Sequence, residues 1–308
     1  MRVAVCGGGV IGGAIALELA RRGAEVTLIE RWRIGGCASG KSGGFLALDW
    51  CDGTPVAQLA RRSFALHELW AEELGNPYGF RKVDTYSTAL STRRQLGRQD
   101  GGPASWLSGE TVHRRAIGTT ATTAQLDPEA FTRTLVGAAE AQGSEVRIDT
   151  IAGLACSADG SRAEGVVLAS GETVAADAVV LALGPWSLLA AQWLSLPPVF
   201  GLKGHSLVFR PAEPVPAEAI FAEFEDDDGD VLSPEIVPRA DGTLYICGLA
   251  GSDGLPVDPS QVLPDDGGCE RLKRVAIRLV PQLATAEVIA AQACFRPITA
   301  DGVPLIGP

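Results

Sequence analysis

The sequence predicts a mixed α/β fold in which a domain of alternating strands and helices carries a second, mainly antiparallel-sheet domain. A strand, a glycine-rich turn, a helix and a second strand follow one another between Arg2 and Glu30. Short apolar runs separated by turn residues fill the region from 201 to 248. These two patterns are typical of a nucleotide-binding unit and of an antiparallel sheet. With 46% hydrophobic and 20% charged residues, the 308-residue chain has enough apolar material for a large core.

Composition excludes several classes of function. The chain has 26 Lys and Arg against 37 Asp and Glu, a formal net charge of −11, which disfavours binding to nucleic acid or to anionic membranes. No apolar run approaches about 18 residues, so we expect no membrane span. Three His and seven Cys without a C-x-x-C pair predict no metal site, and reduced, buried, structural thiols. The glycine turn begins at residue 7, leaving no room for a leader, so we expect a cytoplasmic protein.

The first unit is the most regular part of the sequence. An apolar strand at Arg2–Cys6 precedes the glycines, and the apolar positions of Ala14–Arg22 suit a buried helix that Gly23 ends. Residues Glu25–Ile29 alternate as a second strand. The whole is a β-loop-α-β unit.

The central region predicts two further helices and three strands. Pro55–Leu74 has helical apolar spacing, whereas residues 76–122 look irregular and suggest an insertion. Asp127 and Pro128 are the cap and first residue expected of a helix that reaches Gly143. The three predicted strands are Val146–Ile151, Ala163–Ala169 and Ala178–Leu183.

The last third predicts the antiparallel sheet. Its expected strands are Gly201–Phe209, Glu235–Pro238 and Thr243–Gly248, followed by a helix at Glu270–Val280. The acidic run from 223 to 230 lacks the spacing of a calcium loop, so we expect a solvated loop there.

The glycine turn has the spacing of a dinucleotide-binding fingerprint. Gly7 permits a tight turn, Gly9 lets the backbone approach a pyrophosphate, and Gly12 lets the helix pack on the strand. The pyrophosphate then meets the helix N-terminus, next to Val10 and Ile11. Glu30 ends the second strand, where its carboxylate suits ribose hydroxyls and opposes the 2′-phosphate of NADP. The fingerprint alone leaves FAD and NAD open.

Three further motifs follow the fingerprint in a distinctive order. They are the Ser- and Gly-rich segment GCASGKSGGFL from Gly36, the apolar segment AVVLALGPW from Ala178, and FRPITADGVPLIG from Phe295. With these motifs the sequence resembles, over nearly its whole length, the FAD-dependent oxidoreductases of the D-amino-acid oxidase, glycine oxidase and sarcosine oxidase superfamily. The segment SGKSGGFLALDWCDG (Ser39–Gly53) further resembles an uncharacterised fungal and plant branch of this superfamily. The resemblance implies a Rossmann-type FAD-binding domain of the glutathione-reductase-like kind.

The resemblance also implies which residues contact FAD. The Ser- and Gly-rich segment from Gly36 is expected along the ribityl chain and the isoalloxazine edge, and the apolar segment from Ala178 is expected near the flavin. Ile151 stands where the family has a residue facing adenine, although an ordinary core position explains it equally well. The cofactor-binding candidates are Gly7, Gly9, Val10, Ile11, Gly12, Glu30, Arg31, Ser39, Gly40, Ser42, Gly43, Gly44, Leu46, Ile151, Ala182, Gly184, Trp186 and Gly307.

We expect two interleaved domains. Residues 1–76, 123–200 and 287–308 are predicted to form the FAD-binding domain, and residues 77–122 and 201–286 the substrate domain.

Two side chains are the predicted catalytic residues. In the family, the Arg of the R-P motif grips the substrate carboxylate, which assigns that role to Arg296; a structural ion pair, for example with Asp301, is the alternative. Glu235 stands where glycine oxidases have a pocket Tyr, and its carboxylate suits a cationic or polar substrate; a solvated strand-end residue is equally compatible. We interpret the lone His205 as structural rather than as a flavin neighbour.

The resemblance implies a small-molecule amino-acid or secondary-amine substrate. A neutral amine would lose hydride to flavin N5, oxygen would reoxidise the flavin, and the imine would hydrolyse. Family members continue beyond the I-G-P element with a strand, a turn and a helix, whereas this sequence ends at Pro308, so we expect a C-terminally short member. The Ser- and Gly-rich segment from Gly36 and the segment from Phe295 that contains Arg296 disfavour an NAD-dependent dehydrogenase. A non-catalytic or truncated protein with a binding or assembly role is the alternative.

Overall fold

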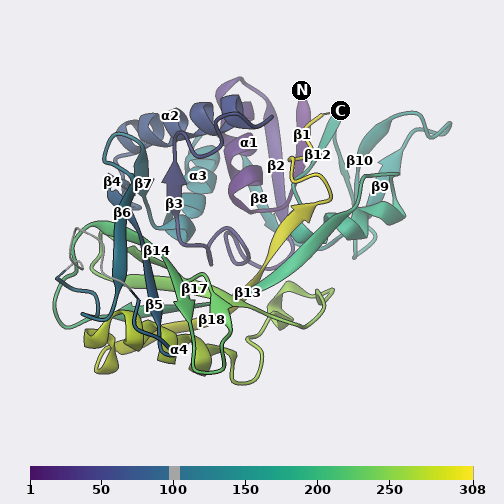
Figure 1. Cartoon of the computed structure of the whole chain (residues 1–308). Coiled ribbons are helices and arrows are strands. Elements are labelled where there is room, and N and C mark those ends of the chain that lie inside the picture. Colours follow the sequence, from purple (N-terminus) through teal and green to yellow (C-terminus); the bar gives the residue numbers. More distant parts are fainter. Residues whose placement is uncertain (97–104, 308) are drawn as a thin grey trace.

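A computed structural model describes residues 1–96 and 105–307. Figure 1 shows helices and a parallel sheet in one half of the molecule, and a large sheet backed by a helix in the other. The predicted α/β architecture with a second, mainly antiparallel sheet is therefore confirmed. In the described part of the chain, no helix is long and apolar enough to cross a membrane.

The first unit builds the parallel sheet, with strand order β12-β1-β2-β8. It comprises β1 (Arg2–Cys6), α1 (Val10–Arg21) and β2 (Glu25–Glu30), joined by β8 (Glu145–Ile148) and β12 (Ala178–Leu181). The apolar side chains of β1 and β2 pack with α1 and with α3 (Pro128–Ala141), and this burial forms the first core. Asp127 caps α3 as predicted, accepting the backbone N–H of Ala130 at 2.9 Å.

Two small sheets and one helix surround this unit. The predicted strand Val146–Ile151 is confirmed to Ile148 as part of β8, but β8 ends there and Ile151 begins β9 of another sheet; between them the Asp149 side chain accepts the N–H of Thr150. The elements are α2 (Ala57–Glu73), the sheet of β3 (Phe45–Ala47), β7 (Thr123–Gln125) and β4 (Arg81–Lys82), and the sheet of β11 (Thr173–Ala175), β10 (Ala163–Leu168) and β9 (Ile151–Cys156).

The large sheet has the order β18-β13-β17-β16-β14-β5-β6, with β15 paired to β14. All its neighbours are antiparallel except β14 and β5. Its strands are β5 (Asp84–Ser91), β6 (Val112–Gly118), β13 (Val199–Arg210), β14 (Glu218–Glu225), β15 (Val231–Leu232), β16 (Glu235–Pro238), β17 (Leu244–Ala250) and β18 (Glu287–Thr299). One face packs on α4 (Gly268–Leu279) through the second core, leaving the other face for the site. Within residues 1–96 and 105–307, the 3-10 helices are Gly184–Gln192, Pro259–Gln261 and Pro281–Ala284.

Two expectations for this half are wrong. The stretch 76–122 is not irregular, because β4, β5 and β6 lie in it; in β5 the buried positions include Thr85 and Thr88, whose polar side chains give no apolar strand pattern. The acidic run is only partly a loop, since β14 continues to Glu225. The turn that follows is fixed by Asp226, which accepts the N–H of Asp228 and pairs with Arg271.

The chain crosses between the two halves several times. β18, which the predicted division groups with the FAD-binding segments, pairs with β13 from Val199 to Arg210. The chain therefore enters the large sheet again after α4, and the predicted domain boundaries stay a prediction.

Candidate functional site

The glycine turn between β1 and α1 has room only for glycine. Gly7 has a φ of +112°, a conformation that L side chains rarely adopt. A Cβ on Gly12 would lie 1.8 Å from the Gly7 carbonyl oxygen, and one on Gly7 would lie 2.3 Å from that of Ala182. The turn therefore brings the N-terminus of α1 close to the ends of β1 and β12.

The N-terminus of α1 is open to an anion. Its cap is Gly9, which has no side chain to cap the helix, and its first turn has no acidic residue. The N–H of Val10 donates to the Ser39 hydroxyl at 2.9 Å, and the Ile11 side chain is exposed. The N–H groups at a helix start and the helix dipole favour a phosphate here.

Glu30 organises the neighbouring turn. Its two carboxylate oxygens accept the backbone N–H of Gly8 at 2.7 Å and of Trp32 at 2.9 Å. A carboxylate has further lone pairs, so it can also accept from ribose hydroxyls. The adjacent Arg31 instead donates to the carbonyl of Val257 at 2.8 Å, which ties the turn to the 251–263 loop.

The segment Ser39–Leu46, here called the serine–glycine loop, lies between the two halves. A Cβ on Gly44, whose φ is +71°, would lie 2.0 Å from the Leu126 carbonyl oxygen. The Tyr245 hydroxyl donates to the Lys41 carbonyl at 3.1 Å, and the buried Lys41 ammonium donates to the Ala293 carbonyl at 2.9 Å. These bonds with β17 and β18 fix the loop against the large sheet.

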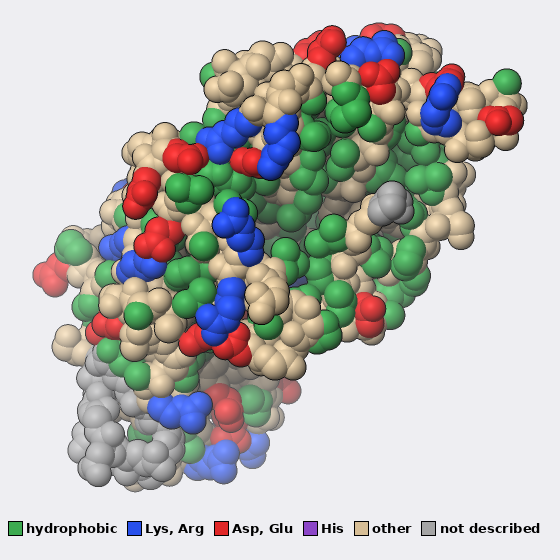
Figure 2. Space-filling view, turned by 90° about the horizontal axis from the view of Figure 1, so that it is seen from above, with side chains coloured by type: hydrophobic (Ala, Val, Ile, Leu, Met, Phe, Trp, Pro, Cys, Tyr) green, Lys and Arg blue, Asp and Glu red, His purple; other side chains and the backbone are tan. Residues whose placement is uncertain are grey.

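A cavity of about 500 Å³ opens between this loop and the large sheet. The volume lies in the range of small-molecule sites. The surface seen in Figure 2 is hollowed, with hydrophobic side chains gathered in the hollow. The lining residues are Val10, Ala38, Ser39, Ser42, Gly43, Gly44, Phe45, Leu46, Trp50, His67, Leu126, Pro128, Phe131, Thr132, Gly204, His205, Ser206, Phe221, Glu235, Tyr245, Cys247, Cys294, Arg296 and Pro297.

Part of the cavity wall is one row of the large sheet. Ser206, Cys247, Glu235 and Phe221 are partners in turn across β13, β17, β16 and β14. Residues directly opposite on neighbouring strands share a face of the sheet. The row is thus a set of adjacent side chains on the face opposite α4.

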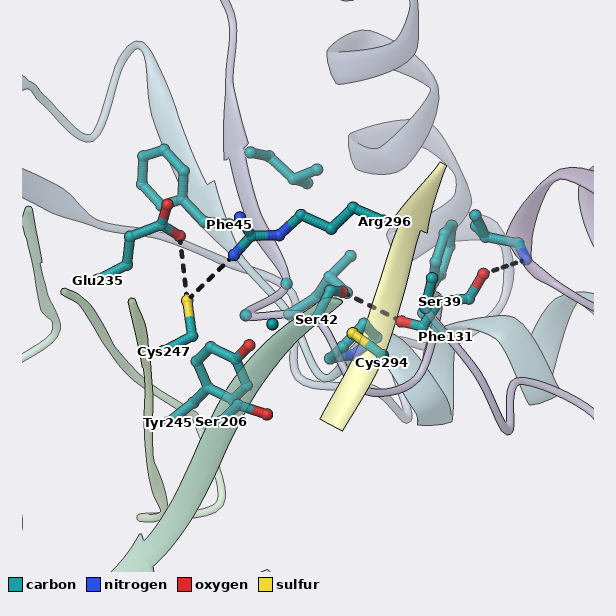
Figure 3. A pocket seen from close by; sticks show the side chains of 18 of the residues that line it. Ser39, Ser42, Phe45, Phe131, Ser206, Glu235, Tyr245, Cys247, Cys294 and Arg296 are labelled. Atoms are coloured by element: carbon teal, nitrogen blue, oxygen red, sulfur yellow. Dashed lines mark hydrogen bonds between the residues drawn. The ribbon is translucent and has the colours of Figure 1, made fainter. Parts of the chain in front are cut away.

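Cys247 of β17 lies between two charged groups, Glu235 of the neighbouring β16 and Arg296 of β18, two strands away (Figure 3). Its thiol donates to the Glu235 carboxylate at 3.7 Å and accepts from the Arg296 guanidinium at 3.8 Å. Burial, and next the Glu235 charge, raise the pKa of the Cys247 thiol to about 12, so it stays neutral near pH 7. Among the described residues no carboxylate pairs with Arg296, and Asp301 instead accepts the N–H of Val303.

The Glu235 end of the cavity also carries aromatic rings. The rings of Phe45, Trp50 and Phe221 contact one another with centroids 4.9 to 5.1 Å apart. Phe45 and Phe221 are half-buried and Trp50 is 42% exposed, so the rings give this end of the cavity an apolar border.

The remaining predicted residues lie outside this cavity. Gly40 packs on the carbonyl of Gly35, and Ile151 packs in the core beneath the parallel sheet. Gly184 begins the 3-10 helix that contains Trp186, whose indole N–H donates to the Pro256 carbonyl at 2.8 Å. Ala182 follows β12 beside the glycine turn, and Gly307 is exposed with no neighbour within 4 Å of a Cβ.

His205 lines the cavity but is held by the protein. It is 1% exposed, and its Nε2 accepts the backbone N–H of Asp265 at 2.9 Å. The seven thiols are free, as expected, but they are not all buried, because Cys156 is exposed. Cys247 and Cys294 line the cavity, which a purely structural interpretation of the thiols did not anticipate.

The structure brings eight predicted residues to one cavity, namely Val10, Ser39, Ser42, Gly43, Gly44, Leu46, Glu235 and Arg296. Sequence reasoning missed Cys247, Tyr245 and Phe221. The strand that carries Cys247 was predicted, but its pairing with β16, which sets Cys247 opposite Glu235, was not.

These residues fit FAD. The glycine turn and the open helix end suit its pyrophosphate, Glu30 suits its ribose, and the serine–glycine loop leads into a cavity wide enough for a ring system. The glycine turn and Glu30 would hold the adenosine end of FAD, and the serine–glycine loop would hold its flavin.

The comparisons agree with this geometry. A glycine oxidase of Geobacillus kaustophilus is 30% identical over 340 residues, covering 99% of this chain and 83% of that protein. A Schizosaccharomyces pombe protein named "putative oxidoreductase" is 25% identical over 333 residues, covering 99% of this chain and 85% of that protein. The crystal structure of the Geobacillus kaustophilus glycine oxidase matches with a TM-score of 0.79 and 26% identity over 99% of this chain and 85% of that one. The family model for FAD dependent oxidoreductases (DAO) matches residues 2–308, and the chain belongs to this family.

Proposed function

We propose that the protein oxidises the C–N bond of an amino acid or secondary amine that carries a carboxylate. The observation that carries this proposal is Arg296: its guanidinium faces the cavity, and none of the described carboxylates pairs with it. A planar guanidinium binds a carboxylate through two parallel hydrogen bonds. Glycine oxidases among the relatives support this substrate class.

The protein's own groups bind, orient and exclude water. Arg296 holds the carboxylate, the serine–glycine loop orients the flavin ring, and the rings of Phe45 and Phe221 keep the reacting carbon dry. Bound FAD would supply the acceptor for a hydride from the substrate α-carbon and the means of passing two electrons on to oxygen. The resulting imine hydrolyses in water.

The test begins with the visible spectrum of the purified chain and identification of the chromophore released on denaturation. FAD-loaded protein is then mixed anaerobically with glycine, sarcosine and other amino acids, and with methylamine and dimethylamine, which lack the carboxylate. Bleaching of the flavin by carboxylate-bearing amines, with hydrogen peroxide formed after oxygen is added, is the expected result. Bleaching by the bare amines at equal rates, or by no compound, would overturn the proposal.

A further inference from the structure

The cavity contains one carboxylate among the described residues that line it, and that is Glu235. It lies beside Arg296 without pairing with it. Its Oε2 lies 3.7 Å from the Cys247 sulfur, and Arg296 Nη2 lies 3.8 Å from the same sulfur. The distance from Glu235 Oε2 to Arg296 Nη2 therefore cannot exceed the sum of these two distances. An acid and a guanidinium held this close on one wall form a site for a molecule with both charges.

The separation selects where the ligand's positive charge lies. In an α-amino acid the nitrogen is about 2.7 Å from the nearer carboxylate oxygen, by ordinary bond lengths. With a charge-assisted hydrogen bond of about 2.8 Å at each end, such a molecule bridges roughly 8 Å when straight and less when bent. A cation at the end of a long side chain would overshoot Glu235.

Resting on the proposed function, we propose that Glu235 binds the reacting amine of an α-amino acid and accepts its proton. The ammonium N–H bond breaks, an O–H bond forms on Glu235, and the electron pair stays on nitrogen. No electrons change hands in this step. The neutral amine that results is the form that loses hydride from its α-carbon.

The other titratable groups around Glu235 do not serve as the base. Cys247 from β17 and Arg296 from β18 are the titratable groups that face it, while β14 and β3 present only Phe221 and Phe45. Burial keeps the Cys247 thiol neutral near pH 7, because it raises the pKa of that group, and arginine remains charged.

Groups farther along the cavity are also unsuited. His205 Nε2 already accepts the N–H of Asp265, and burial raises the pKa of Tyr245 well above its ordinary value. The His67 ring packs on Phe131 with centroids 4.8 Å apart, and in Figure 3 Phe131 lies on the side away from Glu235. Burial lowers the pKa of His67. Burial has the opposite effect on the Cys294 thiol, whose pKa it raises.

Cys247 then acts as the spacer of the pair. Its sulfur lies between the acid and the guanidinium and contacts both, so neither group neutralises the other. Each remains available to the opposite charge of the ligand. This is a positioning role, because the thiol itself exchanges no proton.

The first test measures binding without turnover. FAD-loaded protein is reduced with dithionite, so that it cannot oxidise a ligand, and glycine and acetate are titrated by calorimetry. The wild-type protein is expected to prefer glycine over acetate, and Glu235→Gln to reduce that preference about tenfold to a hundredfold. The control Glu223→Gln removes the same charge from an exposed position on β14, outside the cavity, and should leave the preference unchanged.

The second test is the pH profile of anaerobic flavin reduction with the best α-amino acid. Without the base, Glu235→Gln can use only the neutral amine, so its kcat/KM should rise about tenfold per pH unit until the substrate amine is deprotonated. Wild-type protein should be flat over much of that range. Parallel profiles for the two proteins would overturn the proton transfer.

The binding measurements distinguish a failure of the Glu235 role from a failure of the proposed function. If Arg296→Ala weakens both glycine and acetate while Glu235→Gln leaves the glycine preference intact, the role of Glu235 is wrong and the proposed function stands. If Arg296→Ala affects neither ligand, or if wild-type protein binds neither, the proposed function fails as well.

Discussion

A Cβ atom on Gly12 would lie 1.8 Å from the carbonyl oxygen of Gly7, which is nearer than any real side chain comes to backbone. The obstructing atom belongs to the turn itself, so a side chain could be accommodated only by moving the turn. The packing of α1 on β1 and the geometry of the phosphate site therefore depend on the same contact.

We expect Gly12→Ala to lose FAD binding and about 3 kcal/mol of unfolding free energy, because the turn must open. Flavin absorbance after gel filtration and chemical denaturation measure the two effects. The matched control is Gly137→Ala on α3, where a Cβ meets nothing within 4 Å and alanine is the better helix former. Equal behaviour of the two variants would contradict the steric argument.

Glu30→Gln should weaken FAD binding about tenfold or more. The carboxylate accepts two backbone N–H groups, and the amide can accept only at one oxygen, so the turn loses a charge-assisted bond. Equilibrium titration of protein freed of FAD, followed by flavin fluorescence, gives the dissociation constant. Glu25→Gln, at the exposed start of the same strand, should leave that constant unchanged.

Arg296→Lys should raise the dissociation constant for acetate about tenfold or more in the FAD-loaded protein. Lysine keeps the charge but lacks the planar pair of donors. Perturbation of the flavin spectrum reports the binding. An unaltered constant would mean that the carboxylate binds elsewhere.

Cys6→Ala should reduce the amount by which the free energy of unfolding decreases at alkaline pH. Burial raises the pKa of the Cys6 thiol from 9.0 to about 12, so the folded protein holds a proton that the unfolded chain releases. The stability from this group is present below about pH 9 and is lost as the pH rises toward 12. Urea denaturation at pH 8 and pH 10 measures the difference, and Cys156→Ala, at an exposed thiol, is the control.

The fold could be predicted most completely where the signals are local. The glycine turn, α1 and β2 follow from spacing between Arg2 and Glu30, and Asp127 and Pro128 mark the start of α3 by their own chemistry. The strands of the segment 76–122 could not be predicted, because β5 pairs in parallel with the distant β14, beginning with Asp84 beside Glu218. Such pairing leaves no local pattern.

The site shows the same division. The serine–glycine loop and Arg296 were predicted from motifs, and the structure places them in one cavity. Cys247 was missed because its importance comes from the register that sets it opposite Glu235, a relation between strands that no single segment contains.

The four side chains of the row from Ser206 to Phe221 make up part of the cavity wall, and each comes from a different strand. Each member stands on its own strand, and the hydrophobic underside of those strands is secured independently by α4. Glu235 and Phe221 are half-buried, so a substitution at either can change the charge or width of the cavity, whereas Ser206 and Cys247 are 2% and 3% exposed and are held by their packing.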